Sequence, residues 1–181
     1  MKKRYNDLNT YLRNIFGCRV QKITVDAGLT CPNRDGTLSH GGCIYCNIRG
    51  SGTGAHAKGL SITRQLTNGK NSLSKRYKAK KFIAYFQSFS NTYAPLQDLQ
   101  RLYDEALRVD DIVGLAIGTR PDCVDEAVLD LLQDYARHHL IWIEYGLQSA
   151  RDATLAFINR GHDVQCFRNA VEKSRSRGIK I

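Results

Sequence analysis

Apolar positions in this chain alternate between short continuous runs and longer stretches in which they recur every three or four residues. Short apolar runs are typical of buried parallel strands, and the wider spacing is typical of amphipathic helices. The pattern predicts strands at 20–25, 82–86, 112–117 and 140–145, and helices within 1–18, 61–77, 96–107, 124–135 and from 152 onward. Because strands and helices alternate, we expect an α/β fold with a parallel sheet and right-handed crossovers.

The last predicted unit brings the chain to the start of another strand. Ser149 and Asp152 have capping-box spacing, and Gly178 is placed to stop a helix just before Ile179. A buried parallel strand with an open neighbour makes an unfavourable edge. We therefore read 1–181 as a single core domain with about four complete strand–helix units, incomplete at its C-terminal end.

Polar residues follow the predicted strands. In open parallel sheets, ligands bind at the carboxyl ends of the strands, so these positions are candidate site residues. They are Gln87 and Ser88, Arg120 and Asp122, and Glu144 and Gln148.

A loop rich in cysteine, glycine and proline follows the first predicted strand. It covers residues 26–54 and contains Cys31, Cys43 and Cys46. Three thiolates on one loop suggest a metal site with one open coordination position, because a closed structural zinc site needs four protein ligands. The remaining cysteines stand alone, and we expect them to be small buried side chains; they are Cys18, Cys123 and Cys166.

Composition narrows the classes of protein. No apolar run approaches the roughly 20 residues of a membrane span, and the N-terminal segment lacks the unbroken apolar centre of a secretion signal. We therefore expect a cytoplasmic protein that is not embedded in a membrane. The formal net charge is +10, and the basic run 75–81 favours a polyanionic partner such as tRNA, although such a run is often only a solvated face.

The segment Cys43-Ile-Tyr-Cys46 resembles the cysteine, any residue, aromatic, cysteine pattern of the radical S-adenosylmethionine (SAM) enzymes. The gap of eleven residues between Cys31 and Cys43 resembles the elongator-type subgroup of that family, which includes tRNA-modifying members. Further segments resemble a bacterial branch of this subgroup, namely 86–95, 117–122, 144–149 and 159–162.

The resemblance implies a partial (β/α)6 barrel and two cofactors, a 4Fe-4S cluster and SAM. The cluster would be held by Cys31, Cys43 and Cys46; its reduction would cleave SAM and generate a 5'-deoxyadenosyl radical, with the electron coming from a flavodoxin or ferredoxin. The implied substrate is tRNA at the wobble uridine. The cofactor-binding positions that the resemblance implies are Tyr45 beside the adenine, Gln87 and Ser88 at the methionine amine, and Glu144 and Gln148 near SAM and its ribose.

Other interpretations remain open. Tyr45 could instead pack under its loop, Glu144 and Gln148 could make structural hydrogen bonds, and Arg120 with Asp122 could contact substrate or fix a turn; His162 is expected to be structural. His40 could complete a zinc site in a nucleic-acid-binding module. Glycines at 50–54 or 68–70 could bind a nucleotide. The substrate could be a small molecule, or the chain could be an inactive remnant.

Overall fold

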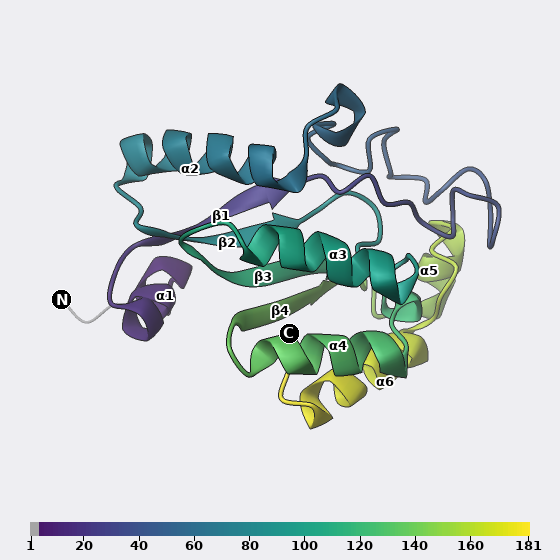
Figure 1. The fold of residues 1–181 in the computed structure, drawn as a ribbon. Helices are drawn as coiled ribbons and strands as arrows, with labels where there is room; N and C mark the ends of the chain where they lie inside the picture. The colour runs from purple at the N-terminus through teal and green to yellow at the C-terminus, as the bar shows by residue number, and fades with distance from the viewer. Residues whose placement is uncertain (1–3) are drawn as a thin grey trace.

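The computed structural model describes residues 4–181 and contains a four-stranded parallel sheet in the order β1-β2-β3-β4 (Figure 1). The strands are β1 (Val20–Val25), β2 (Lys81–Phe86), β3 (Ile112–Thr119) and β4 (Leu140–Tyr145). Each strand pairs in parallel with the next in the sequence. The predicted α/β fold is confirmed, and all the carboxyl ends of the strands lie at one edge of the sheet.

The helices fall near their predicted positions. They are α1 (Leu8–Phe16), α2 (Ile62–Tyr77), α3 (Leu96–Leu107), α4 (Glu126–Ala136), α5 (Asp152–Phe157) and α6 (Val164–Ser176). The N-terminal helix is shorter than the predicted 1–18, because Asp7 caps its start and Gly17, in the left-handed conformation, ends it. Residues 1–3 of that prediction lie outside the described residues.

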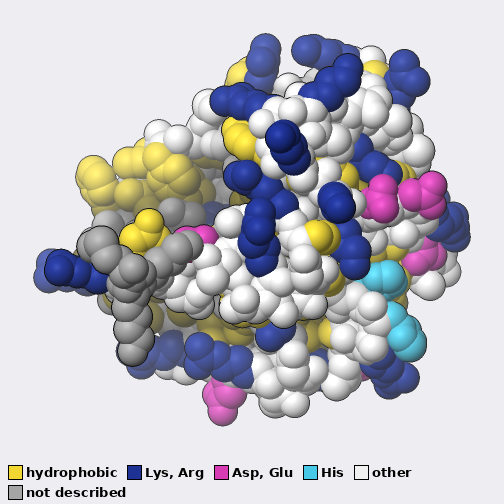
Figure 2. All heavy atoms as spheres, turned by 90° about the vertical axis from the view of Figure 1, so that its left-hand side faces the viewer, with side chains coloured by type: hydrophobic (Ala, Val, Ile, Leu, Met, Phe, Trp, Pro, Cys, Tyr) yellow, Lys and Arg dark blue, Asp and Glu magenta, His cyan; other side chains and the backbone are white. Residues whose placement is uncertain are grey.

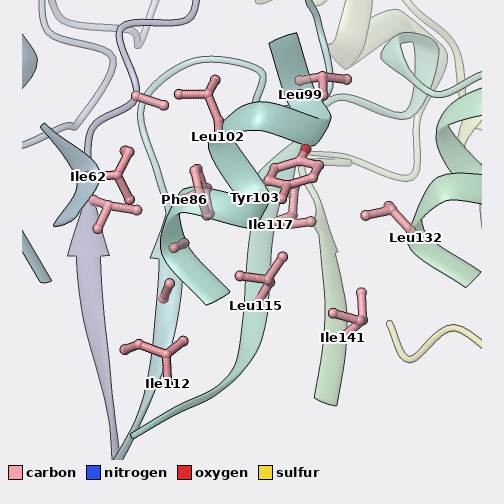
Figure 3. Packing of buried hydrophobic residues seen from close by; sticks show 14 of the residues in the cluster. Ile62, Phe86, Leu99, Leu102, Tyr103, Ile112, Leu115, Ile117, Leu132 and Ile141 are labelled. Carbon is pink, nitrogen blue, oxygen red and sulfur yellow. The ribbon is translucent and has the colours of Figure 1, made fainter. Parts of the chain in front are cut away.

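Helices α2, α3 and α4 cover one face of the sheet and α1 packs against the other (Figure 1). The larger core lies under α2, α3 and α4, where Phe86 meets the Tyr103 ring edge-on (Figure 3). Gly69 does not break α2, because it lets the helix approach β1 closely: a Cβ there would lie 2.4 Å from Cγ2 of Ile23. On the other face, Leu12 of α1 packs with Ile83 and Ala116.

The end of the chain lies beside β4. The Ile143 amide donates to the Lys180 carbonyl at 2.9 Å, and Lys180 forms a parallel bridge with Trp142. The expected strand start after Gly178 is therefore present. The predicted capping box is wrong: Arg151 is the N-cap of α5 and makes no side-chain cap, while Asp152 instead accepts from the Val164 amide at 2.8 Å.

Among residues 4–181, no helix is both long enough and apolar enough to cross a membrane.

Candidate active site

The cysteine loop lies beyond the carboxyl ends of the strands, next to the segment that follows α5 (Figure 1). The buried Asn33 amide donates to the carbonyls of Asn159, at 2.7 Å, and Arg160, at 3.1 Å. Asn159 in turn donates to the Gly42 carbonyl at 2.9 Å. These reciprocal bonds fix the cysteine loop to a segment more than a hundred residues away in the sequence.

A cavity of about 230 Å³ lies between this loop and the strand ends. Asp122, one of the candidates that follow a strand, is absent from its lining, but every predicted metal-ligating and cofactor-binding residue is present. These residues are Cys31, Cys43, Tyr45, Cys46, Gln87, Ser88, Glu144 and Gln148. The structure therefore brings the eight candidates to one place, as expected for residues at the carboxyl edge of a parallel sheet.

Each of the three cysteine sulfurs has its own arginine. Arg160 Nη1 lies 3.6 Å from the Cys43 sulfur, Arg34 Nη1 lies 3.8 Å from the Cys46 sulfur, and Arg120 Nη1 lies 3.9 Å from the Cys31 sulfur. Arg120 and Arg160 are almost fully buried. Buried cations beside thiols favour their thiolate forms, so the cavity is electrically suited to hold negative sulfur.

The surroundings of the cysteines act on their ionisation in different directions. Burial opposes ionisation of the Cys43 thiol, but hydrogen bonds from Tyr45, Arg160 and Asn33 outweigh burial and lower the pKa of Cys43. Burial raises the pKa of Cys46, and Arg34 offsets only part of that effect. Burial and the hydrogen bond to Cys43 also raise the pKa of the Tyr45 phenol, so Tyr45 remains a neutral donor.

Tyr45 is half exposed at the rim of the cavity, with 51% of its surface accessible. It is therefore not packed under its loop, which was the alternative considered from the sequence. Its ring is accessible to a bound molecule.

No group of three or more His, Cys, Asp or Glu side chains in residues 4–181 is arranged to hold a single metal ion. His40 is exposed, and it is absent from the lining of the cavity. The alternative zinc site of three cysteines and His40 is therefore not formed by this structure.

Ser88 at the end of β2 is an unpartnered polar group in the cavity. Its hydroxyl is buried without a hydrogen-bond partner, and its backbone has a φ of 127°, a conformation that side-chain-bearing residues rarely adopt. The hydroxyl of Ser90, which also lines the cavity, is buried and unpartnered as well. Buried hydroxyls without partners are costly, so both are suited to a ligand that would supply the missing hydrogen bonds.

Glu144 at the end of β4 is held by neighbours on the face of the sheet against which α1 packs. It forms an ion pair with Lys22 and accepts a hydrogen bond from Tyr85, and burial followed by the Glu144 charge raises the pKa of Tyr85 to about 12. Lys22 also lies over the Tyr85 and Trp142 rings, at 4.5 and 5.2 Å from their centroids. Glu144 therefore makes structural contacts within the protein, which was one of the two roles considered for it from the sequence. The same carboxylate still faces the cavity.

Gln148 lies on the short connection after β4 and has a φ of 73°, in the left-handed region. Its side chain is near Gly146, where an added Cβ would approach Gln148 Nε2 to 2.8 Å. A side chain at position 146 would therefore crowd Gln148, which lines the cavity with it.

Arg120 follows β3 and fixes its turn, because its guanidinium donates to both Asp122 oxygens, at 2.8 and 2.6 Å. From the sequence, Arg120 and Asp122 were expected either to fix this turn or to contact a ligand. The structure shows the turn, and it also directs the remaining nitrogen of Arg120 toward Cys31.

Several other candidates are placed away from the cavity or are differently exposed. Residues 68–70 lie inside α2, so they form no phosphate-binding loop, whereas Gly50 lines the cavity. Cys123 is buried as predicted, but Cys18, in the connection between α1 and β1, and Cys166, on α6, are only half-buried. His162 bonds to the Asp163 carbonyl at 3.2 Å and is absent from the cavity lining.

A second cavity, of about 700 Å³, lies outside the strand ends near the starts of α3 and α4. It is larger but contains none of the three clustered cysteines. The smaller cavity is therefore the candidate active site, since the thiols, the buried arginines and the unpartnered hydroxyls meet there.

Comparison with protein families gives the same assignment. The model of the radical SAM superfamily matches residues 31–181, which begin at the first cysteine of the loop. The chain belongs to the radical SAM superfamily. The resemblance found in the sequence is confirmed at the level of the superfamily.

Two bacterial relatives match the chain along nearly its whole length. YtqA of Bacillus subtilis strain 168 is 42% identical over 180 residues, covering 99% of this chain and 56% of YtqA. YhcC of Escherichia coli strain K12 is 42% identical over 182 residues, covering 100% of this chain and 58% of YhcC. The chain thus spans somewhat more than half the length of these curated relatives.

Similarity also extends to an archaeal relative and to a solved structure. The protein MJ0486 of Methanocaldococcus jannaschii is 37% identical over 173 residues, covering 94% of this chain and 52% of MJ0486. The structure of OxsB, a cobalamin-dependent SAM radical enzyme, superposes with a TM-score of 0.56 at 15% identity, covering 87% of this chain and 22% of OxsB. The latter likeness concerns the fold, a partial barrel of the radical SAM type.

Sequence reasoning missed three site residues, which are Asn33, Arg34 and Arg160. Arg34 and Asn33 lie between the first two cysteines of the superfamily loop, where a polar residue reads as ordinary loop surface. Arg160 lies in a segment that resembled the family, yet nothing local indicated that it reaches Cys43 across 117 positions of sequence. The signal that could have indicated Arg160 was its place in the segment 159–162, which resembled the family but had been given no role.

Proposed function

We propose that the chain carries the catalytic core of a radical SAM enzyme of the elongator-type subgroup. In this proposal Cys31, Cys43 and Cys46 hold a 4Fe-4S cluster and the adjoining cavity binds SAM. Held there, the cluster would supply the one electron that cleaves SAM and so would start radical chemistry on the substrate. The free state of the cysteines fits a reducing compartment, which favours the cytoplasm.

The observation that carries this proposal is the pairing of three clustered cysteines with three arginines around one cavity. The donor set also fits: three thiols line the same cavity, and His40, considered as a fourth ligand, is exposed. A three-thiolate cluster leaves one iron free for SAM, whereas a four-ligand structural site would not.

The protein's own residues would bind and orient SAM. The unpartnered Ser88 hydroxyl and the neighbouring Gln87 suit the polar amino acid end, and the accessible Tyr45 ring suits the adenine. Glu144 and Gln148 supply an acceptor and an amide at the opposite wall, where ribose hydroxyls would be satisfied. Arg34, Arg120 and Arg160 would stabilise the added negative charge when an electron arrives.

Supply of that electron requires a donor such as a flavodoxin or a ferredoxin.

We propose a tRNA wobble uridine as the substrate, because the elongator-type resemblance and the net charge of +10 both favour a polyanion. A small-molecule substrate is the second candidate, favoured by the modest cavity of about 230 Å³.

Reductive SAM cleavage tests the enzyme proposal. The chain would be reconstituted anaerobically with iron and sulfide, mixed with SAM and dithionite, and assayed for 5'-deoxyadenosine by chromatography. Formation of 5'-deoxyadenosine that is lost in Cys43→Ala and retained in Cys166→Ala is the expected result. Cys166 is a suitable control because it is half-buried on α6 and absent from the cavity. A reconstituted, folded protein that leaves SAM intact would refute the proposal and favour an inactive remnant.

Addition of bulk tRNA tests whether tRNA is the substrate. Its addition is expected to stimulate 5'-deoxyadenosine formation, and nucleoside mass spectrometry is expected to find a changed substituent at carbon 5 of a wobble uridine. SAM cleavage that tRNA neither stimulates nor alters would favour a small-molecule substrate.

A further inference from the structure

Six cations gather at the edge of the sheet opposite the candidate active site. They lie at the end of α2, in the connection before β1 and at the start of β2. We call this surface the basic face; it consists of Arg19, Lys75, Arg76, Lys78, Lys80 and Lys81. Figure 2 shows this side of the molecule, where Lys and Arg side chains are numerous and Asp and Glu lie mainly toward the margins.

The backbone ties the separate parts of the basic face together. The amides of Lys80 and Lys81 both donate to the Arg19 carbonyl, at 3.1 and 3.5 Å. Lys81 lies over the Phe16 ring of α1, 5.6 Å from its centroid. The cations are therefore held on one surface by the fold.

Tyr77 organises two of these cations. The guanidinium carbons of Arg19 and Arg76 lie 5.3 and 5.0 Å from its ring centroid. Contacts of this kind hold guanidinium groups in place while leaving their N–H groups free to donate. Two oriented guanidinium groups beside one ring suit phosphate oxygens, which they can contact with paired hydrogen bonds.

None of the six cations has a carboxylate within ion-pair distance in the part of the chain that the structure describes. By contrast, the nearby Lys70 pairs with Asp111 at 3.1 Å. Lys75 and Arg76 lie in the last turn of α2, where the negative end of the helix dipole explains the presence of cations. It does not account for Arg19, Lys80 and Lys81, which belong to other segments.

We propose that the basic face binds the phosphate backbone of an RNA substrate at a second point, remote from the cavity. The inference rests on the proposed tRNA function and extends it to a specific surface. Charge complementarity selects this partner, because unpaired cations release condensed counterions when they meet a nucleic acid backbone.

The separation of the two sites follows from β2. Lys81 begins this strand on the basic face, and Gln87 follows it in the cavity. Six residues of strand at about 3.3 Å each place the two sites about 20 Å apart. At the spacing of a DNA strand, about 3.4 Å of helix axis per phosphate, that distance corresponds to about six phosphates, and the more compact A-form helix of RNA fits at least as many. A nucleotide in the cavity would therefore leave a flanking stem within reach of the basic face.

Binding of bulk tRNA, measured by fluorescence anisotropy between about 50 and 200 mM salt, tests the inference. The test variant is Lys78→Glu with Lys80→Glu, and the matched control is Arg168→Glu with Arg175→Glu. All four side chains are exposed, and both variants change the net charge equally. Arg168 and Arg175 lie on α6, away from α2. Thermal unfolding would confirm that both variants fold.

The expected result is weaker binding by the test variant, with the slope of log affinity against log salt reduced by about 1.4 to 1.8, and wild-type binding by the control. Equal binding by all three proteins would overturn the inference, while tRNA-stimulated SAM cleavage would still support the proposed function. If the wild type does not bind tRNA at low salt, both the inference and the tRNA substrate are overturned. The same holds if the wild type binds phosphatidylglycerol vesicles, tested in parallel, but not tRNA. SAM cleavage without tRNA would then still report the enzyme activity.

Discussion

Replacement of Arg160 by Gln should lower the reduction potential of a cluster bound at the three cysteines. Arg160 is 6% exposed, and its guanidinium donates to the Gly146 carbonyl at 2.6 and 3.2 Å and lies 3.6 Å from the Cys43 sulfur. Its charge is therefore fixed next to a cluster ligand. Because a reduced cluster carries one more negative charge, a nearby fixed cation stabilises the reduced form.

The size of the effect follows from Coulomb's law. If the added charge is taken to lie about twice as far from the guanidinium as the Cys43 sulfur does, about 7 Å, it would interact with it by about 2.4 kcal/mol at an effective dielectric constant of about 20. For a one-electron couple this corresponds to a potential about 100 mV more negative in Arg160→Gln.

The assay is a redox titration followed by electron paramagnetic resonance on the reconstituted protein. Arg160→Lys keeps the charge and should retain most of the wild-type potential, and Arg168→Gln on the exposed face of α6 should retain all of it. Iron content is measured in each sample, so that a lost cluster is distinguished from a shifted one. A fully loaded Arg160→Gln protein with an unchanged potential would refute the electrostatic role of Arg160.

Three further substitutions test the structure around the cavity. Ser88→Gly removes an unpartnered buried hydroxyl and relieves the positive φ, so it should raise the free energy of unfolding in urea by about 1 kcal/mol. The same substitution should weaken SAM binding, because the hydroxyl is expected to contact SAM. An unchanged SAM affinity would argue against that contact. Asn33→Ala removes hydrogen bonds to two carbonyls and should lower the free energy of unfolding by about 2 kcal/mol, which a decrease below about 0.5 kcal/mol would contradict. Because burial and Glu144 raise the pKa of Tyr85 from 10.0 to about 12, its folded form retains its proton longer and its contribution to stability is lost as the pH rises through that interval. In Glu144→Gln, the Tyr85 phenol should ionise at lower pH in an ultraviolet titration, and an unchanged midpoint would show that burial alone sets it.

Local patterns were sufficient to predict the sheet and the members of the site that follow strands. The apolar runs and helical spacing determine strand and helix positions, and parallel pairing then brings Gln87, Ser88 and Glu144 to one edge without any knowledge of individual contacts. The three cysteines were visible because their spacing carries its own chemical meaning. These features depend on short stretches of sequence.

Contacts between distant segments were not predictable in this way. Arg160 approaches Cys43 only because Asn33 and Asn159 fasten two loops together. The capping box at Ser149 failed for a related reason, since Asp152 bonds to the start of α6 in place of its own helix. The basic run appeared in the sequence as a single feature, but only the fold shows that Arg19 joins it and that it lies away from the cavity.

Iron and sulfide content after anaerobic reconstitution tests the central claim most directly. The chain is compared with a variant in which Cys31, Cys43 and Cys46 are all replaced by Ala, and with Cys123→Ala, which lies outside the cavity. The account predicts about four irons and four sulfides per chain, present in the wild type and in Cys123→Ala and absent from the triple variant. Zinc in place of iron, or a folded wild-type protein without metal, would contradict it.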